Sequence, residues 1–249
     1  MYHTGLVSVS FRHLTPEQII QAVKDAGLSC IEWGSDVHAP CHDLERLEHI
    51  ASLQQKTGIT CSSYGTYFTL GRDNVDTLED YIAAAKVLGT NILRLWCGTK
   101  GSQKYALDEL GTLYAECRQA AAIAEAHGVI LCMECHNHTV TDTKESALAL
   151  MEAVHSPFFR MYWQPNQYRT SEENIRYLQQ LKPYIDYLHV FQWDRDGQYP
   201  LAEGIEIWKT YLSMLEGDRT LLLEFMPDHR LETLPAEAES LRKIIQEVN

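Results

Sequence analysis

The sequence lacks several features that would assign it to common classes of protein. No stretch approaches the roughly 20 consecutive apolar residues that are needed to cross a bilayer. The first residues also lack the basic segment followed by an apolar segment that marks an export signal. We therefore expect a cytoplasmic protein with no membrane partner.

Basic residues are scarce relative to acidic ones. The 249 residues include 21 lysines and arginines against 34 aspartates and glutamates, which gives a formal net charge of -13. This balance repels the phosphate backbone of nucleic acids, so a nucleic acid is not an expected partner. The 45% hydrophobic and 22% charged residues are typical of a globular protein with a sizeable core.

Linkers, nucleotide motifs and disulfide patterns are also missing. No proline-rich segment or change in composition divides the chain, so we expect one domain over residues 1–249. Neither GxGxxG nor a GxxxxGKS or GxxxxGKT motif follows a strand-like run, and the usual nucleotide-binding folds are therefore not supported. The seven cysteines form an odd set, mostly in or beside apolar runs, which predicts free buried thiols.

What the sequence does contain is one pattern repeated eight times: a short β-rich run, a polar or glycine-containing loop, and an amphipathic helical stretch. Because parallel neighbouring strands need a crossover of this length, the alternation predicts a parallel sheet. Eight cycles favour a single eight-stranded parallel (β/α)8 TIM barrel over an open doubly wound sheet. The candidate strands are Gly5–Val9, Cys30–Trp33, Thr60–Ser63, Ile92–Trp96, Val129–Glu134, Phe159–Gln164, Tyr187–Phe191 and Leu221–Phe225.

Helix boundaries are marked by residues that suit helix ends. Thr15-Pro16-Glu17-Gln18 combines an N-cap threonine, a proline at the first helical position and a glutamine able to close a capping box. Glycines stand just before several strands, where a helix needs a residue that tolerates the left-handed conformation. They are Gly27, Gly58, Gly89 and Gly128.

Four polar residues, Glu134, Gln164, His189 and Glu224, each end a separate apolar run. A parallel barrel gathers the carboxyl ends of its strands around one mouth, so these distant residues can meet there. Carboxylate and amide oxygens with one imidazole nitrogen suit a divalent metal ion such as Mn²⁺, Mg²⁺, Co²⁺ or Zn²⁺. Without an ion, a buried Glu134 needs another partner, and Arg94 is the alternative candidate.

Short motifs surround these four residues: Glu134-Cys-His136, Tyr162-Trp163-Gln164-Pro165-Asn166, Ile185-Asp-Tyr-Leu-His189-Val190 and Leu223-Glu224. Together they resemble the xylose isomerase-like barrel superfamily of sugar isomerases, epimerases and dehydratases, over nearly the whole chain. The resemblance implies that one divalent ion is held at the positions of Glu134, Gln164, His189 and Glu224. The family usually has aspartate where this chain has Gln164, and the loss of a negative charge predicts weaker binding of the ion.

The resemblance implies a divalent-metal-dependent carbohydrate isomerase or epimerase acting on an unphosphorylated sugar or keto-acid. The ion would polarise a carbonyl, and Glu134 and Glu224 would flank the substrate as acid and base. Loss of a β-hydroxyl by the same chemistry gives the alternative, a dehydratase or lyase of the inosose or dehydroshikimate type. A barrel that binds sugar without turnover, because its metal site is weakened, is a third hypothesis.

Side chains at the same barrel end are the expected substrate contacts, because strand-end aromatic residues commonly stack on sugar faces. They are Trp33, His38, Tyr64, Trp96, His136, Asn166 and Arg195. The expected partner is a small sugar or keto-acid, and association into a homo-oligomer stays open.

His136-Asn-His138 suggests a further alternative, a metal-dependent hydrolase barrel. In that architecture, however, the HxH pair follows the first strand, whereas here it follows the fifth. The endonuclease branch of the same superfamily is disfavoured by the acidic balance of the chain.

Overall fold

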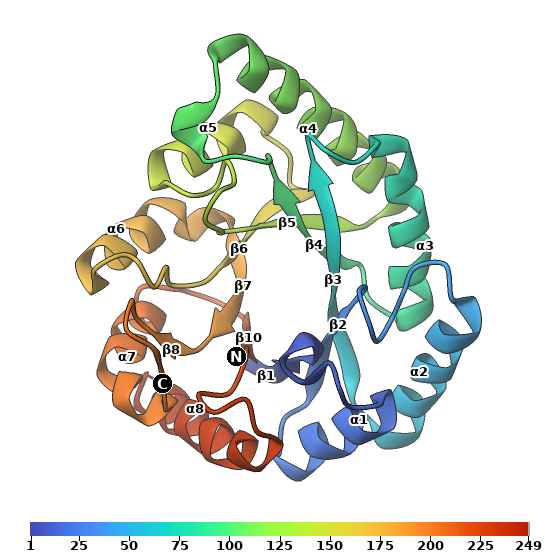
Figure 1. Cartoon of the computed structure of the whole chain (residues 1–249), viewed down its shortest axis with the longest axis vertical. Helices are drawn as coiled ribbons and strands as arrows, with labels where there is room; N and C mark the ends of the chain where they lie inside the picture. Colours follow the sequence, from blue (N-terminus) through green and yellow to red (C-terminus); the bar gives the residue numbers. More distant parts are fainter. Residues whose placement is uncertain (249) are drawn as a thin grey trace.

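Eight parallel strands close into a barrel, and helices surround it (Figure 1). The structure, a computed structural model, describes residues 1–248. The strands follow one another around the barrel in the order β1-β10-β7-β6-β5-β4-β3-β2, which confirms the predicted (β/α)8 fold. Their bounds are β1 Tyr2–Val7, β2 Cys30–Gly34, β3 Thr60–Leu70, β4 Ile92–Cys97, β5 Ile130–Glu134, β6 Phe159–Trp163, β7 Ile185–Val190 and β10 Arg219–Leu223.

The helices lie on the outside of the barrel, and several of them carry the predicted residues at their ends (Figure 1). Thr15 and Gln18 form the predicted capping box at the start of α1. Gly58, Gly89 and Gly128 are left-handed C-caps with φ of 76°, 84° and 67°. The bounds are α1 Pro16–Asp25, α2 Leu44–Thr57, α3 Leu78–Leu88, α4 Leu107–His127, α5 Lys144–Val154, α6 Ser171–Leu181, α7 Ile205–Ser213 and α8 Leu234–Val248.

Some strand limits differ from the sequence prediction. β3 runs on from Ser63 to Leu70 along the mouth of the barrel, where its register with β4 shifts. β7 begins at Ile185, and β10 ends at Leu223, one residue before Glu224. A small antiparallel pair, β8 (Gln192–Trp193) and β9 (Gln198–Tyr199), follows β7 and was not predicted.

The barrel interior is apolar toward the amino ends of the strands and polar toward their carboxyl ends, and strand alternation produces this division. Side chains two positions apart on a strand point to the same face, so an interior apolar residue is followed by another interior residue one layer higher. Here that second residue is polar or charged in five strands. The pairs are Cys30 and Glu32, Ile92 and Arg94, Cys132 and Glu134, Tyr187 and His189, and Leu222 and Glu224.

The larger apolar core fills the layer between the strands and the helices. Fully buried side chains such as Leu6, Ile31 and Leu188 face this layer from alternate strand positions. Within residues 1–248, none of the helices combines the length and apolar character that crossing a membrane requires.

Candidate functional site

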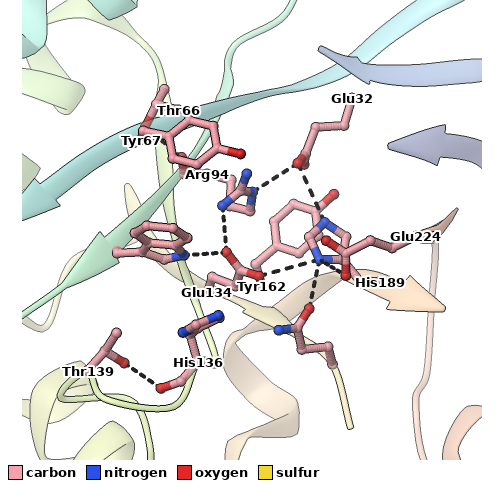
Figure 2. Close-up of polar contacts among 12 residues, drawn as sticks. Glu32, Thr66, Tyr67, Arg94, Glu134, His136, Thr139, Tyr162, His189 and Glu224 are labelled. Carbon is pink, nitrogen blue, oxygen red and sulfur yellow. Dashed lines mark hydrogen bonds and ion pairs between the residues drawn. The ribbon is translucent and has the colours of Figure 1, made fainter. Parts of the chain in front are cut away.

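The four predicted metal ligands meet at one imidazole nitrogen. Nδ1 of His189 lies 2.9 Å from Oε1 of Gln164, 3.3 Å from Oε2 of Glu224 and 3.6 Å from Oε1 of Glu134. Figure 2 shows the side chains of Glu134 and Glu224 turned toward His189 from different strands. The closed barrel therefore brings together residues that are up to 90 positions apart in the sequence, from 134 to 224.

Glu32 and Arg94 form an ion pair beside this cluster. Arg94 was considered from the sequence, but Glu32 was not. Glu32 on β2 is fully buried, and its Oε1 lies 2.9 Å from Nε of Arg94 and 3.5 Å from Nε2 of His189. The hydroxyl of Ser63 donates to the other carboxylate oxygen at 2.8 Å. Burial works against the charged form, but Arg94 and His189 outweigh it and lower the pKa of Glu32 to about 2.

Glu134 is held by Arg94, which the sequence offered as its partner, and also by Trp96. Its Oε2 accepts hydrogen bonds from Nη1 of Arg94 and from the indole Nε1 of Trp96, each at 2.5 Å, while Oε1 faces His189. Burial opposes ionisation, yet Arg94 and His189 hold the pKa of Glu134 well below its usual range. Glu134 is therefore a carboxylate at any physiological pH.

The proton on Nδ1 of His189 occupies the centre of the four candidate ligands, where a cation would bind. A glutamine Oε1 only accepts, so the contact with Gln164 places a proton on Nδ1 of His189. Burial disfavours the imidazolium, but the carboxylates of Glu224, Glu134 and Glu32 raise the pKa of His189 to about 10. Burial and the neighbouring Glu134 raise the pKa of Glu224 despite the attraction of His189.

These residues fit a divalent cation. Donor atoms of Glu134, His189 and Glu224 lie within 4.8 Å of one another. The three carboxylates and the Arg94 guanidinium together carry a charge of -2 when His189 is neutral, which one divalent ion neutralises. Nε2 of His189 has no hydrogen-bond partner and faces Glu32, the arrangement in which a carboxylate orients a metal-bound histidine.

A cavity of about 440 Å³ opens above the cluster at the carboxyl ends of the strands. One wall is aromatic: the rings of Phe191 and Trp193 stack with centroids 4.0 Å apart, and Trp193 lies 5.8 Å from Phe225. These three residues were not among the predicted substrate contacts. Phe225 has a positive φ of 51°, and its amide donates to Ser10 Oγ at 2.8 Å, which holds the strained residue in place.

Three of the predicted substrate contacts, Trp96, His136 and Asn166, line this cavity. His136 lies against Trp96 with ring centroids 5.2 Å apart, and its Nδ1 is 2.8 Å from the carbonyl oxygen of Asn137. A carbonyl oxygen only accepts, so Nδ1 carries the proton and Nε2 is left with a lone pair. His136 is thereby fixed in the tautomer that can accept a proton.

The other four predicted contacts lie outside the cavity lining, and the prediction for them is corrected. Trp33 follows the inward-facing Glu32, so alternation turns it toward the helices, where it donates to Gln54 Oε1 at 2.7 Å. Tyr64 and His38 are also buried away from the cavity. Tyr64 donates to the carbonyl of Ala39, and His38 contacts Ser8 Oγ and the carbonyl of Leu14 at 3.1 Å. Arg195 is exposed and donates to the carbonyl of Tyr168.

The HxH pair does not join the cluster. His136 and His138 both line the cavity, but among residues 1–248 the metal-competent group of acidic, histidine and cysteine side chains is Glu134, His189 and Glu224. The geometry therefore gives no support to the hydrolase alternative.

Comparison with known proteins agrees with the barrel fold. The family model described as "Xylose isomerase-like TIM barrel" matches residues 20–248. A 3-dehydroshikimate dehydratase from Bacillus anthracis is 26% identical over an alignment that spans 269 positions and covers 95% of each chain.

Solved structures match the fold over nearly its whole length. The probable 3-DHS dehydratase of petrobactin synthesis from Bacillus anthracis has a TM-score of 0.79 at 21% identity, covering 97% of this chain and 99% of the other. A xylose isomerase-like TIM barrel protein from Mycobacterium smegmatis, in complex with magnesium, has a TM-score of 0.74 at 15% identity, covering 100% and 97%. At these identities the two structures show a shared fold.

Proposed function

The chain belongs to the xylose isomerase-like TIM barrel family, and from that premise we propose that it is a metal-dependent dehydratase that removes water from a β-hydroxy ketone. The observation that carries the proposal is the whole-length similarity to a 3-dehydroshikimate dehydratase, joined to a cation-competent cluster beneath the cavity. The sequence alone favoured isomerisation or epimerisation. The curated relative supports the alternative instead, so a lyase is the better reading and 3-dehydroshikimate is the first substrate to test.

Glu134, Gln164, His189 and Glu224 would hold the ion. A divalent cation bound there would polarise the substrate carbonyl and acidify the neighbouring C–H bond. Arg94 keeps Glu134 ionised. An ion at Nδ1 of His189 would replace the proton there, and Glu32 faces Nε2, where it can accept the proton of the other tautomer and orient the ring.

His136 is the side chain best placed to move the proton. Its Nδ1 donates to the carbonyl of Asn137, so Nε2 of the neutral ring carries a lone pair, and the side chain lines the cavity. Nε2 would take the proton from the carbon beside the carbonyl. The electron pair of that bond would form the C=C bond, the β C–O bond would break, and the imidazolium would return its proton to the departing oxygen as water leaves.

This scheme changes the role first expected for Glu134. Oε2 of Glu134 already accepts two hydrogen bonds and its pKa is well below the usual range, so it is a poor proton acceptor. We propose it as a ligand. Glu224, whose pKa is raised, remains the candidate for acid–base work should the reaction prove to be an isomerisation.

The aromatic wall supports a cyclic substrate. Phe191, Trp193 and Phe225 form a continuous apolar surface beside the cavity, and such surfaces favour a flat ring over an open-chain polyol. A ring that becomes planar as water leaves gains contact with this wall.

The test is to incubate the purified protein and Mn²⁺ with 3-dehydroshikimate and, separately, with a panel of ketoses, and to identify products by mass spectrometry. We expect a product lighter by one water from the acid, and no such product after chelation of the metal. A ketose product of unchanged mass and altered stereochemistry would restore the isomerase hypothesis. Absence of turnover together with absence of a stoichiometric ion would favour the sugar-binding barrel.

A further inference from the structure

Two arginines line the cavity, and their surroundings differ. Arg94 lies on the floor, is 4% exposed, and bonds two carboxylates, Glu32 and Glu134. Arg12 lies at the rim, directly after the short helix η1 (Ser8–Phe11), and 42% of its side chain is exposed. Two buried carboxylates compensate the charge of Arg94, whereas Arg12 pairs with the single carboxylate of Asp36 and is more exposed, so Arg12 is the arginine better placed to bind an anionic ligand in the cavity.

The guanidinium of Arg12 is held in position by three hydrogen bonds, which leave some of its N–H groups without a partner. Nε donates to Oδ2 of Asp36 at 2.6 Å, Nη1 donates to the carbonyl oxygen of Val9 at 3.2 Å, and Nη2 donates to the hydroxyl of Tyr67. A guanidinium has five N–H groups, so two remain for a ligand. Because the Tyr67 oxygen accepts from Arg12, the hydroxyl proton of Tyr67 is also free to be donated.

Arg12 and Tyr67 therefore present N–H and O–H donors to one side of the cavity. Tyr67 lines the cavity too and packs edge-on against Trp96, with ring centroids 5.5 Å apart. The indole of Trp96 in turn donates to Glu134 at 2.5 Å. One indole thus separates the donors at the rim from the carboxylate cluster on the floor.

From this geometry we infer that Arg12, positioned by Asp36 and assisted by Tyr67, binds a carboxylate of the substrate. The inference rests on the proposed function only in placing the reacting carbonyl at the metal cluster. With the reacting carbonyl at the cation site on the floor, a carboxylate at the other end of the substrate lies at the rim, where the planar fork of Arg12 matches its two oxygens. The substrate is then a small cyclic keto-acid rather than a neutral sugar.

Binding of two matched aromatic compounds tests the inference. One is 3,4-dihydroxybenzoate, the aromatic acid that 3-dehydroshikimate gives by loss of one water, and the other is the neutral 3,4-dihydroxybenzamide. Calorimetric titration in the presence of Mn²⁺ compares wild type, Arg12→Met and Arg12→Lys. We expect Arg12→Met to weaken binding of the acid about 10- to 100-fold and to leave the amide unchanged, with Arg12→Lys between them.

Arg46→Met is the matched control. Arg46 is also an exposed arginine that bonds an aspartate and a backbone carbonyl, with Nε 3.3 Å from Asp43 Oδ2 and Nη1 2.9 Å from the oxygen of Val37. It lies outside the cavity lining, so removing its charge changes only the general electrostatic field. If Arg12→Met does not fold, Tyr67→Phe removes the second donor and is expected to weaken the acid several-fold.

Equal binding of the acid by wild type and Arg12→Met would overturn the inference, as would equal weakening of acid and amide or a wild type that binds neither. The proposed function fails separately. If wild type and Arg12→Met turn over 3-dehydroshikimate equally well, the inference about Arg12 is wrong and the proposed function stands. If the acid binds through Arg12 but the protein does not eliminate water, the dehydratase proposal is wrong and the inference about Arg12 stands.

Discussion

Arg94 and Glu134 form an ion pair at the floor of the cavity, with 2.5 Å between Nη1 and Oε2. The other carboxylate oxygen of Glu134 turns toward His189, where the candidate cation site lies. One side chain thus belongs both to the ion pair and to the ligand set. The two explanations that the sequence offered for a charged residue at this strand end are therefore compatible.

Replacement of Arg94 by methionine is expected to destabilise the fold strongly. The change leaves Glu32 and Glu134 buried without a counter-charge, and breaking such a pair costs about 3–5 kcal/mol in the free energy of unfolding. Urea denaturation measures it. The matched control is Arg160→Met, whose partly exposed pair with Asp186 is worth about 1 kcal/mol or less. Similar losses in both variants would contradict the account of the buried pair.

The stability contributed by Glu32 is expected to disappear in acid. Its folded pKa, about 2, lies below the ordinary value of 4.5, so the contribution is complete above pH 4.5 and is lost as the pH falls toward 2. Urea unfolding of wild type and Glu32→Gln should differ by a few kcal/mol at pH 7, on the order of the shift converted to free energy, and the difference should shrink as the pH falls from 4.5 toward 2. A constant difference across this range would show that the carboxylate charge of Glu32 is not the cause.

The sequence predicted the barrel well because the fold depends on local signals. Strand runs, capping residues such as Thr15 and left-handed positions such as Gly58 report the conformation of their own segment. The four candidate ligands could be grouped from the sequence because each is a polar residue at the end of an apolar run. Glu32 carries the same signal within Cys30–Trp33, but it was not among the predicted site residues.

The substrate contacts were harder to predict, because a strand-end residue can face either the cavity or the helices. Trp33 and Tyr64 were chosen for residue type and strand position, but a shift of one residue on a strand reverses the face. Trp33 follows Glu32, so one inward residue fixes the other outward. Arg12 and Phe225 line the cavity from positions outside the regular elements, and Tyr67 lines it from the part of β3 where the register with β4 shifts. The period of the sequence does not reveal which way such residues face.

Gln164→Glu is expected to strengthen binding of Mn²⁺. The substitution keeps the length of the side chain and adds a negative charge beside Glu134 and Glu224, and cation affinity rises with the number of charged ligands. We expect the dissociation constant, measured by calorimetry on chelator-treated protein, to fall about tenfold. Gln167→Glu adds the same charge at a cavity residue outside the ligand set. An equal gain from that control would mean that Gln164 is not a ligand.

His136→Gln is expected to separate proton transfer from metal binding. The imidazole lies outside the group of ligands, so the variant should bind Mn²⁺ like wild type, while kcat for elimination falls about 100- to 10,000-fold because the proton acceptor is gone. His138→Asn is the comparison: His138 also lines the cavity, but it is exposed at a φ of 63°, which asparagine tolerates, and a loss below about tenfold is expected. Deuterium at the carbon beside the carbonyl should slow the wild-type reaction if removal of that proton limits the rate. Near-normal turnover by His136→Gln would return the acid–base role to Glu134 and Glu224, the pair from which an isomerase mechanism would be built.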